Sequence, residues 1–154
     1  MKILLPVDGS DESLDAVRHA LVLIHEGLRA SVVLANVQEP ASLYELLRAH
    51  DADVIESVTR AAGVHSLEAA NALCAAAGVA CEQELDTGDP AHTLHDIAER
   101  LGCDMVVMGA RGKGGTRGTR LGSVAHAMLH DAALPVTIVR HPDAQGADDD
   151  SARA

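Results

Sequence analysis

Aromatic side chains are almost absent from this chain of 154 residues, which has one tyrosine, Tyr44, and neither tryptophan nor phenylalanine. Basic side chains are also scarce, because 12 lysines and arginines face 23 acidic residues and the formal net charge is −11. Proteins that bind single-stranded nucleic acid combine a positive groove with stacking rings, and anionic membranes attract basic segments. The composition therefore argues against a nucleic-acid partner and against a membrane partner.

Paired cysteines and long apolar runs are missing as well. Cys74, Cys81 and Cys103 form no C-x-x-C pair and are odd in number, so we expect small core residues rather than a disulfide framework or a zinc ribbon. No apolar stretch approaches the roughly 20 residues of a membrane-spanning helix, and the apolar run at the N-terminus is too short for a signal peptide. The sequence predicts a cytoplasmic protein.

What the chain does contain is a regular alternation of apolar runs and helical patterns. Short runs typical of buried strands cover residues 3–7, 31–37, 79–85, 105–108 and 135–140. Helices are expected after Ser10, after Gly88-Asp89-Pro90 and over 123–132, because each begins with a capping pattern or apolar periodicity. Residues 41–77 predict one long helix, or two with a break near Gly63.

This alternation predicts one α/β domain over residues 1–141, built on a doubly wound parallel sheet, followed by an acidic, disordered tail over 142–154. Leu43, Leu46 and Leu47 are expected in the core, and Tyr44 on the surface or in the core. In such sheets ligands bind outside the carboxyl ends of the strands. The loops that begin at Asp8 and at Gly109 are therefore the natural candidates for a site.

The second of these loops is rich in glycine and in positive charge. Residues 109–123 contain six glycines together with four of the 12 basic residues, Arg111, Lys113, Arg117 and Arg120. Glycines let backbone N–H groups approach an anion, and the helix that starts at Ser123 presents unpaired N–H groups at its N-terminus. The combination predicts a polyphosphate site, although the chain has neither a Walker loop nor a G-x-G-x-x-G after the first strand.

The spacing Gly109-x2-Gly112-x9-Gly122-Ser123 resembles the signature of ATP-binding universal stress proteins. The resemblance covers nearly the whole chain, because the opening strand before Asp8, the Gly88-Asp89-Pro90 turn and the two last strands are also similar to that family's landmarks. It implies a five-stranded parallel sheet of order 3-2-1-4-5. It also implies a homodimer formed through the last strand, Pro135 to Arg140, whose apolar edge needs a cover.

The resemblance further implies which residues bind ATP. Pro6, Val7 and Asp8 would lie beside the adenosine, Val37 would touch the adenine, and Met108 and Gly109 would form the floor. The phosphates would be held by backbone amides, one hydroxyl and one guanidinium, from Arg111, Gly112, Gly122, Ser123 and Val124. Without aromatic rings to stack on, adenine would rest on aliphatic walls such as Val7, Val37 and Met108.

Two groups of polar residues admit other interpretations. Asp8 is either a ligand of the ribose or of a Mg²⁺ or Mn²⁺ ion, or an acid that forms the turn before Gly9. The histidine pairs His92/His95 and His126/His130 have spacings that could chelate a metal, but no third ligand accompanies them. We therefore expect exposed or capping histidines and no metal site.

The function that the resemblance implies is an ATP-binding stress-response regulator. A fast enzyme is not expected, because no second carboxylate stands near the loop as a base. Slow ATP hydrolysis and a nucleotide-free dimeric interaction module are the alternatives. An adenylate-transferring enzyme would need an S-G-G-x-D-S or H-x-G-H element after the first strand. Asp8-Gly9-Ser10-Asp11 is neither.

Overall fold

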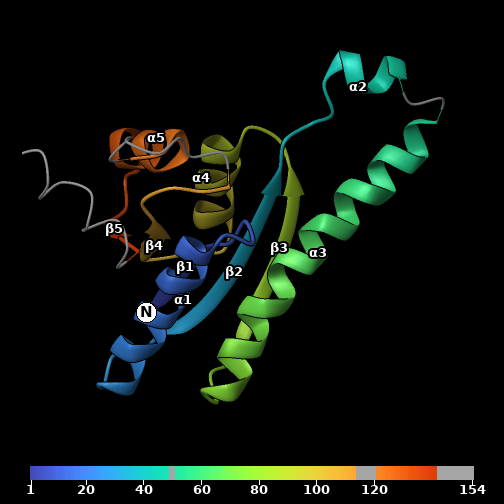
Figure 1. Cartoon of the computed structure of the whole chain (residues 1–154). Coiled ribbons are helices and arrows are strands. Elements are labelled where there is room, and N and C mark those ends of the chain that lie inside the picture. The colour runs from blue at the N-terminus through green and yellow to red at the C-terminus, as the bar shows by residue number, and fades with distance from the viewer. Residues whose placement is uncertain (49–50, 114–120, 142–154) are drawn as a thin grey trace, which may run out of the picture.

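The computed structural model describes residues 1–48, 51–113 and 121–141 and contains one parallel sheet (Figure 1). The strands are β1 (Lys2–Pro6), β2 (Ser31–Gln38), β3 (Cys81–Thr87), β4 (Met105–Gly109) and β5 (Val136–Val139), in the order β3-β2-β1-β4-β5. All neighbouring pairs are parallel. The predicted fold class and strand order are confirmed.

Helices cover both faces of this sheet. They are α1 (Asp11–His25), α2 (Leu43–Arg48), α3 (Ala52–Ala76), α4 (Pro90–Arg100) and α5 (Ser123–Asp131). One core cluster joins α1 and α3 to the face of the sheet that carries Ile3 and Leu5, and a second joins α4 and α5 to the face that carries Leu4 and Val33. The central strands are therefore buried on both sides, which is why their sequences are continuous apolar runs.

The predicted caps hold two of the helices in place. The Ser10 side chain accepts the N–H of Ser13 at the start of α1, and the Asp89 side chain accepts the N–H of His92 at the start of α4, with Pro90 in its first turn. Because both caps directly follow a strand or its turn, they fix the direction in which each helix leaves the carboxyl edge of the sheet.

Neither alternative for residues 41–77, one long helix or two with a break near Gly63, is right. Residue 63 lies inside α3, and the helix that contains it begins after Asp51, which caps α3 by accepting the N–H of Asp53. A Cβ atom at Gly63 would run into the side chain of Leu85 and lie 2.8 Å from Oδ1 of Asn36. The glycine is therefore there to let α3 pack closely on β2 and β3, not to end a helix.

Other expectations need smaller corrections. The third strand begins at Cys81 and ends at Thr87, two residues later at each end than the apolar run suggested. Leu43 and Leu47 are 73% and 74% exposed, so their expected place in the core is wrong, and Tyr44 is exposed beneath the Arg48 guanidinium. They belong to α2, which stands with the start of α3 beyond the edge of the sheet (Figure 1).

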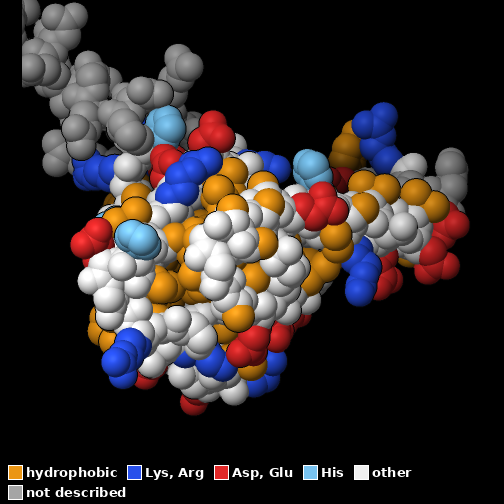
Figure 2. Space-filling view, turned by 90° about the horizontal axis from the view of Figure 1, so that it is seen from below, with side chains coloured by type: hydrophobic (Ala, Val, Ile, Leu, Met, Phe, Trp, Pro, Cys, Tyr) orange, Lys and Arg blue, Asp and Glu red, His pale blue; other side chains and the backbone are white. Residues whose placement is uncertain are grey.

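The end of the molecule at which α1 and α3 terminate carries interspersed apolar, acidic and basic side chains (Figure 2).

No helix in residues 1–48, 51–113 and 121–141 is long and apolar enough to cross a membrane. The predicted tail, 142–154, lies outside the described residues, as do Arg117 and Arg120 of the glycine-rich loop.

Candidate functional site

A cleft of about 790 Å³ opens at the carboxyl edge of the sheet, between the ends of β1, β2 and β4. Every residue predicted for the site lines it. These residues come from β1 and its turn, from β2, from β4 and its loop, and from the first turn of α5: Pro6, Val7, Asp8, Val37, Met108, Gly109, Arg111, Gly112, Gly122, Ser123 and Val124. The topology therefore brings together segments that are more than a hundred residues apart in the sequence.

Asp8 ties the first of these segments to the glycine-rich loop. Its Oδ1 accepts the N–H of Ser10 at 2.9 Å and the hydroxyl of Ser10, and its Oδ2 accepts the N–H of Lys113 at 2.9 Å. Partial burial alone would raise the pKa of Asp8, but the hydrogen bonds from Ser10 and Lys113 outweigh it and lower that pKa. Asp8 is therefore a carboxylate that both forms the turn and anchors the loop.

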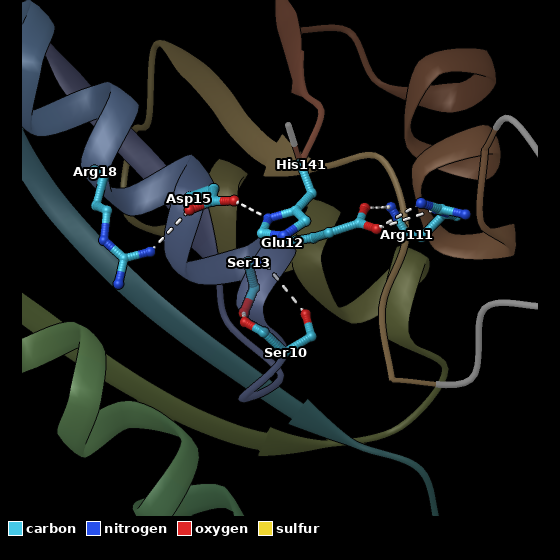
Figure 3. Close-up of polar contacts among 7 residues, drawn as sticks. All are labelled: Ser10, Glu12, Ser13, Asp15, Arg18, Arg111 and His141. Carbon is cyan, nitrogen blue, oxygen red and sulfur yellow. Dashed lines mark hydrogen bonds and ion pairs between the residues drawn. The ribbon is translucent and has the colours of Figure 1, made fainter. Parts of the chain in front are cut away.

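Glu12, in the first turn of α1, holds Arg111 in the same way (Figure 3). Its carboxylate accepts the backbone N–H of Arg111 at 2.8 Å and the guanidinium Nε–H at 3.1 Å, and Nη2 lies 3.0 Å from Oε1. The guanidinium predicted to bind phosphate is thus paired with a carboxylate of the chain itself. Sequence reasoning missed Glu12, whose place in a first turn suggested only a favourable helix dipole.

A Cβ atom would collide with neighbouring atoms at Gly109 and Gly112 and would fit tightly at Gly122. A Cβ at Gly109 would lie 2.9 Å from the backbone of Glu12, and one at Gly112 would meet the Asp8 carboxylate. A Cβ at Gly122 would lie 3.3 Å from Cα of Arg111. The glycine spacing thus permits close packing of the loop against α1 and against itself, in addition to any freedom it gives the backbone.

Some backbone N–H groups of the described part of the loop are paired within the chain. The N–H of Arg111 goes to Glu12, that of Lys113 to Asp8, and that of Gly122 to the carbonyl of Ala110 at 2.7 Å. By contrast, no acceptor in the described part of the chain takes the N–H groups of three cleft residues: Gly112, Ser123 and Val124. Ser123 and Val124 begin α5, so their N–H groups belong to the positive end of that helix.

Lys113 adds a positive charge next to these amides. Its Nζ lies over the turn after β1, 3.0 Å from where a Cβ of Gly9 would be. No ion pair within the described chain holds it, whereas Arg111 is paired. Among the described residues, Arg111 and Lys113 are the cations that line the cleft, and Lys113 is the one without a carboxylate partner there.

The other half of the cleft is apolar, with one buried polar residue that sequence reasoning missed. Val7, Val37 and Met108 line it together with Pro90 and Leu94 of α4. Asn36 is 1% exposed, donates from Nδ2 to the carbonyl of Val7 at 2.7 Å and accepts from Gln38. An asparagine inside the apolar run of β2 was the signal for it, because buried amides need fixed partners.

The histidine pairs His92/His95 and His126/His130 were expected not to form a metal site. Among the described residues, no group of three or more His, Cys, Asp or Glu side chains is placed to hold a metal ion. His92 pairs weakly with Asp96 on its own helix, and the His92 and His130 side chains are exposed.

Comparison with known proteins places the chain in a family. A model described as the universal stress protein family matches residues 1–140. The chain belongs to the universal stress protein family. A universal stress protein of Methanocaldococcus jannaschii is 32% identical over 141 residues, covering 92% of this chain and 82% of the relative. Another, from Bacillus subtilis, is 33% identical over 149 residues, covering 90% and 98%.

Among solved structures, a universal stress protein in complex with cAMP is 28% identical to this universal stress protein. It superposes with a TM-score of 0.67 over 90% of this chain and 96% of the other. The likeness extends over the whole described domain, so the cleft belongs to the shared fold and is not an addition to it.

Proposed function

We propose that this universal stress protein binds ATP in the cleft and acts as a nucleotide-dependent regulator of a stress response. The observation that carries the proposal is that the N–H groups of Gly112, Ser123 and Val124, which line the cleft at or beside the start of α5, have no acceptor among the described residues. Free N–H groups at the N-terminus of a helix favour an anion. A related protein bound to cAMP supports an adenine nucleotide as that anion.

The dimensions and the chemistry of the cleft fit the two halves of the nucleotide. Adenine lies against the aliphatic side chains of Val7, Val37 and Met108, and the ribose lies near Asp8. The phosphates accept the free amides, the Ser123 hydroxyl and the Lys113 ammonium. A Mg²⁺ or Mn²⁺ ion that came with the nucleotide would neutralise phosphate charge, and because such ions keep most of their waters, it would need few ligands from the protein.

Regulation is favoured over rapid catalysis because the carboxylates nearest the loop are already engaged. Asp8 accepts from Ser10 and Lys113, and Glu12 accepts from Arg111, so neither is placed as a free general base for water. Hydrolysis of ATP is then slow compared with its binding, and bound ATP acts by its presence rather than by its turnover.

The protein acts in the cytoplasm as a homodimer. The dimer forms through β5 and covers the partly buried edge that this strand exposes.

The direct test is to ask what the purified protein carries. Acid extraction of freshly purified protein followed by anion-exchange chromatography is expected to release an adenine nucleotide, and added ATP is expected to refill the emptied protein. Gly122→Val is the matched variant, because a side chain there would fill the space between Arg111 and the phosphates. If the extract of the wild-type protein contains no adenine nucleotide and added ATP does not bind to it, the proposal is wrong.

A further inference from the structure

Two of the three cysteines lie together at the end of the molecule opposite the cleft. Cys74 is in the last turn of α3 and Cys81 is the first residue of β3. The chain reverses between them at Gly78, which has a φ of +68°, and the N–H of Val79 donates to the carbonyl of Cys74 at 2.9 Å. This tight reversal brings the two side chains into one apolar cluster.

The orientation of the Cys81 side chain is fixed toward its neighbour. Its thiol donates to Oδ1 of Asn71 at 3.1 Å, and Asn71 precedes Cys74 by one turn of α3. The Cys81 thiol lies close enough to Cys74 to help raise the pKa of the Cys74 thiol. Cys103 belongs to the cluster on the other face of the sheet and has no such partner within the described residues.

The environments of the two thiols differ. Cys74 is fully buried, whereas Cys81 is half-buried on an edge strand and reaches solvent. Burial, together with the adjacent Cys81 thiol, raises the pKa of Cys74 to about 12. Cys74 therefore stays a thiol at neutral pH, and Cys81 is the sulfur that an oxidant in solution meets first.

We propose that Cys74 and Cys81 form a reversible intramolecular disulfide when the protein meets a peroxide. In the first step the Cys81 sulfur attacks hydrogen peroxide, the O–O bond breaks, and Cys81 becomes a sulfenic acid while one water leaves. In the second step the Cys74 sulfur attacks that sulfur, the S–S bond forms, and the hydroxyl leaves with the Cys74 proton as a second water. Two thiols are oxidised and one peroxide is reduced.

The disulfide would close a ring between the end of α3 and the start of β3. Because this ring lies at the amino end of β3 and the cleft lies at the carboxyl end of the sheet, oxidation locks the α3–β3 connection without filling the nucleotide site. The proposal is independent of ATP binding. The raised pKa of Cys74 also makes the second step slow near neutral pH and faster in alkaline solution.

Peptide mapping after oxidation tests it. The protein is treated with hydrogen peroxide, blocked with N-ethylmaleimide under denaturing conditions, and digested with trypsin, which leaves Cys74 and Cys81 in one peptide, 61–100, and Cys103 in another. We expect peptide 61–100 to lose two hydrogens and both maleimide labels, with recovery on adding dithiothreitol. Cys103→Ser is the matched control and should behave identically.

Two further variants separate the roles of the sulfurs. In Cys74→Ser, Cys81 should stop at a sulfenic acid that reacts with dimedone, and in Cys81→Ser, Cys74 should resist the same dose. The proposal is overturned if wild-type peptide 61–100 keeps both labels, or if Cys81 is driven to sulfinic acid while Cys74 remains a free thiol. It is also overturned if Cys74 oxidises equally well without Cys81.

Discussion

The guanidinium of Arg111 lies against the carboxylate of Glu12, which also accepts the backbone N–H of Arg111 at 2.8 Å. This one pair joins the first turn of α1 to the loop that follows β4. It also neutralises the positive charge that Arg111 carries into the cleft. Arg111 therefore stabilises the fold, whereas Lys113 is available to bind phosphate, and this difference leads to two opposite predictions.

Replacing Arg111 by Met should lower stability more than it lowers ATP affinity. The change removes the guanidinium from the partly buried Glu12 carboxylate and leaves it only the backbone N–H of residue 111, a loss of about 1–3 kcal/mol of unfolding free energy. Urea unfolding followed by circular dichroism measures it. Because the guanidinium is already neutralised, the remaining folded protein should bind ATP within a few-fold of wild type. A loss of binding without a loss of stability would place Arg111 on the phosphates instead.

Replacing Lys113 by Met should do the reverse. No ion pair of the described chain depends on this side chain, so unfolding should be nearly unchanged. ATP affinity should fall about tenfold, the value of one charge-assisted hydrogen bond, and the salt dependence of binding should weaken. AMP should lose less than ATP, because it presents fewer phosphate charges. Equal affinities for wild type and variant would show that Lys113 does not contact the nucleotide.

A methyl group at Gly112 should disturb the site through Asp8. A Cβ there meets the Asp8 carboxylate, which must then move and release the N–H of Lys113. Gly112→Ala is thus expected to lower ATP affinity by tenfold or more, on the scale of losing a hydrogen bond to a charged group. Gly102→Ala is the control for a destabilising glycine change away from the cleft, because its φ of +64° strains the backbone while a Cβ there meets nothing within 4 Å; this variant should keep the wild-type ATP affinity. Titration of both purified variants with ATP makes the comparison.

A substitution at Gly63 distinguishes a glycine that permits close packing from one that breaks a helix. In an open helix, Gly→Ala stabilises by roughly 0.5–1 kcal/mol. Here the added methyl would collide with Leu85 and crowd Asn36, so Gly63→Ala should destabilise by about 1–3 kcal/mol, the usual cost of overpacking. Because Asn36 supports the carbonyl of Val7, adenine binding should weaken too. An increase in the urea midpoint would show that α3 does not approach the sheet this closely.

Lowering the pH should reduce the free energy of unfolding, because Asp8 becomes protonated. Its pKa in the folded protein is lower than the ordinary value of 3.8, so its hydrogen bonds stabilise the fold above that value. This contribution is lost as the pH falls through the folded-state pKa. Unfolding of wild type and Asp8→Asn should therefore differ most at pH 5 to 7 and converge in more acidic solution. Asp131→Asn, whose carboxylate is 75% exposed, should track wild type throughout.

The sequence predicted the sheet and the cleft well because both depend on local patterns. Continuous apolar runs indicated strands buried on both faces, and the caps at Ser10 and Asp89 placed two helices correctly. Parallel topology then required the strand ends, and hence the predicted residues, to meet at one edge. This is why every residue predicted for the site lines the cleft.

What the sequence did not predict depends on contacts between distant segments. Gly63 looks like a helix break until Leu85 and Asn36 are seen beneath it, and nothing in the sequence around Arg111 shows that Glu12 lies beside it. Leu43 and Leu47 have the composition of a core, but α2 extends beyond the sheet and leaves them exposed. In each case the local pattern is the same for both outcomes, and only the tertiary partner decides.

Calorimetric titration of nucleotide-free protein with ATP tests the central proposal most directly. The account predicts saturable binding by wild type, binding that weakens as phosphates are removed from the nucleotide, and its loss in Gly122→Val although that variant keeps the wild-type circular dichroism spectrum. The absence of any binding heat with wild type, or an affinity that Gly122→Val leaves unchanged, would contradict a phosphate site at the start of α5.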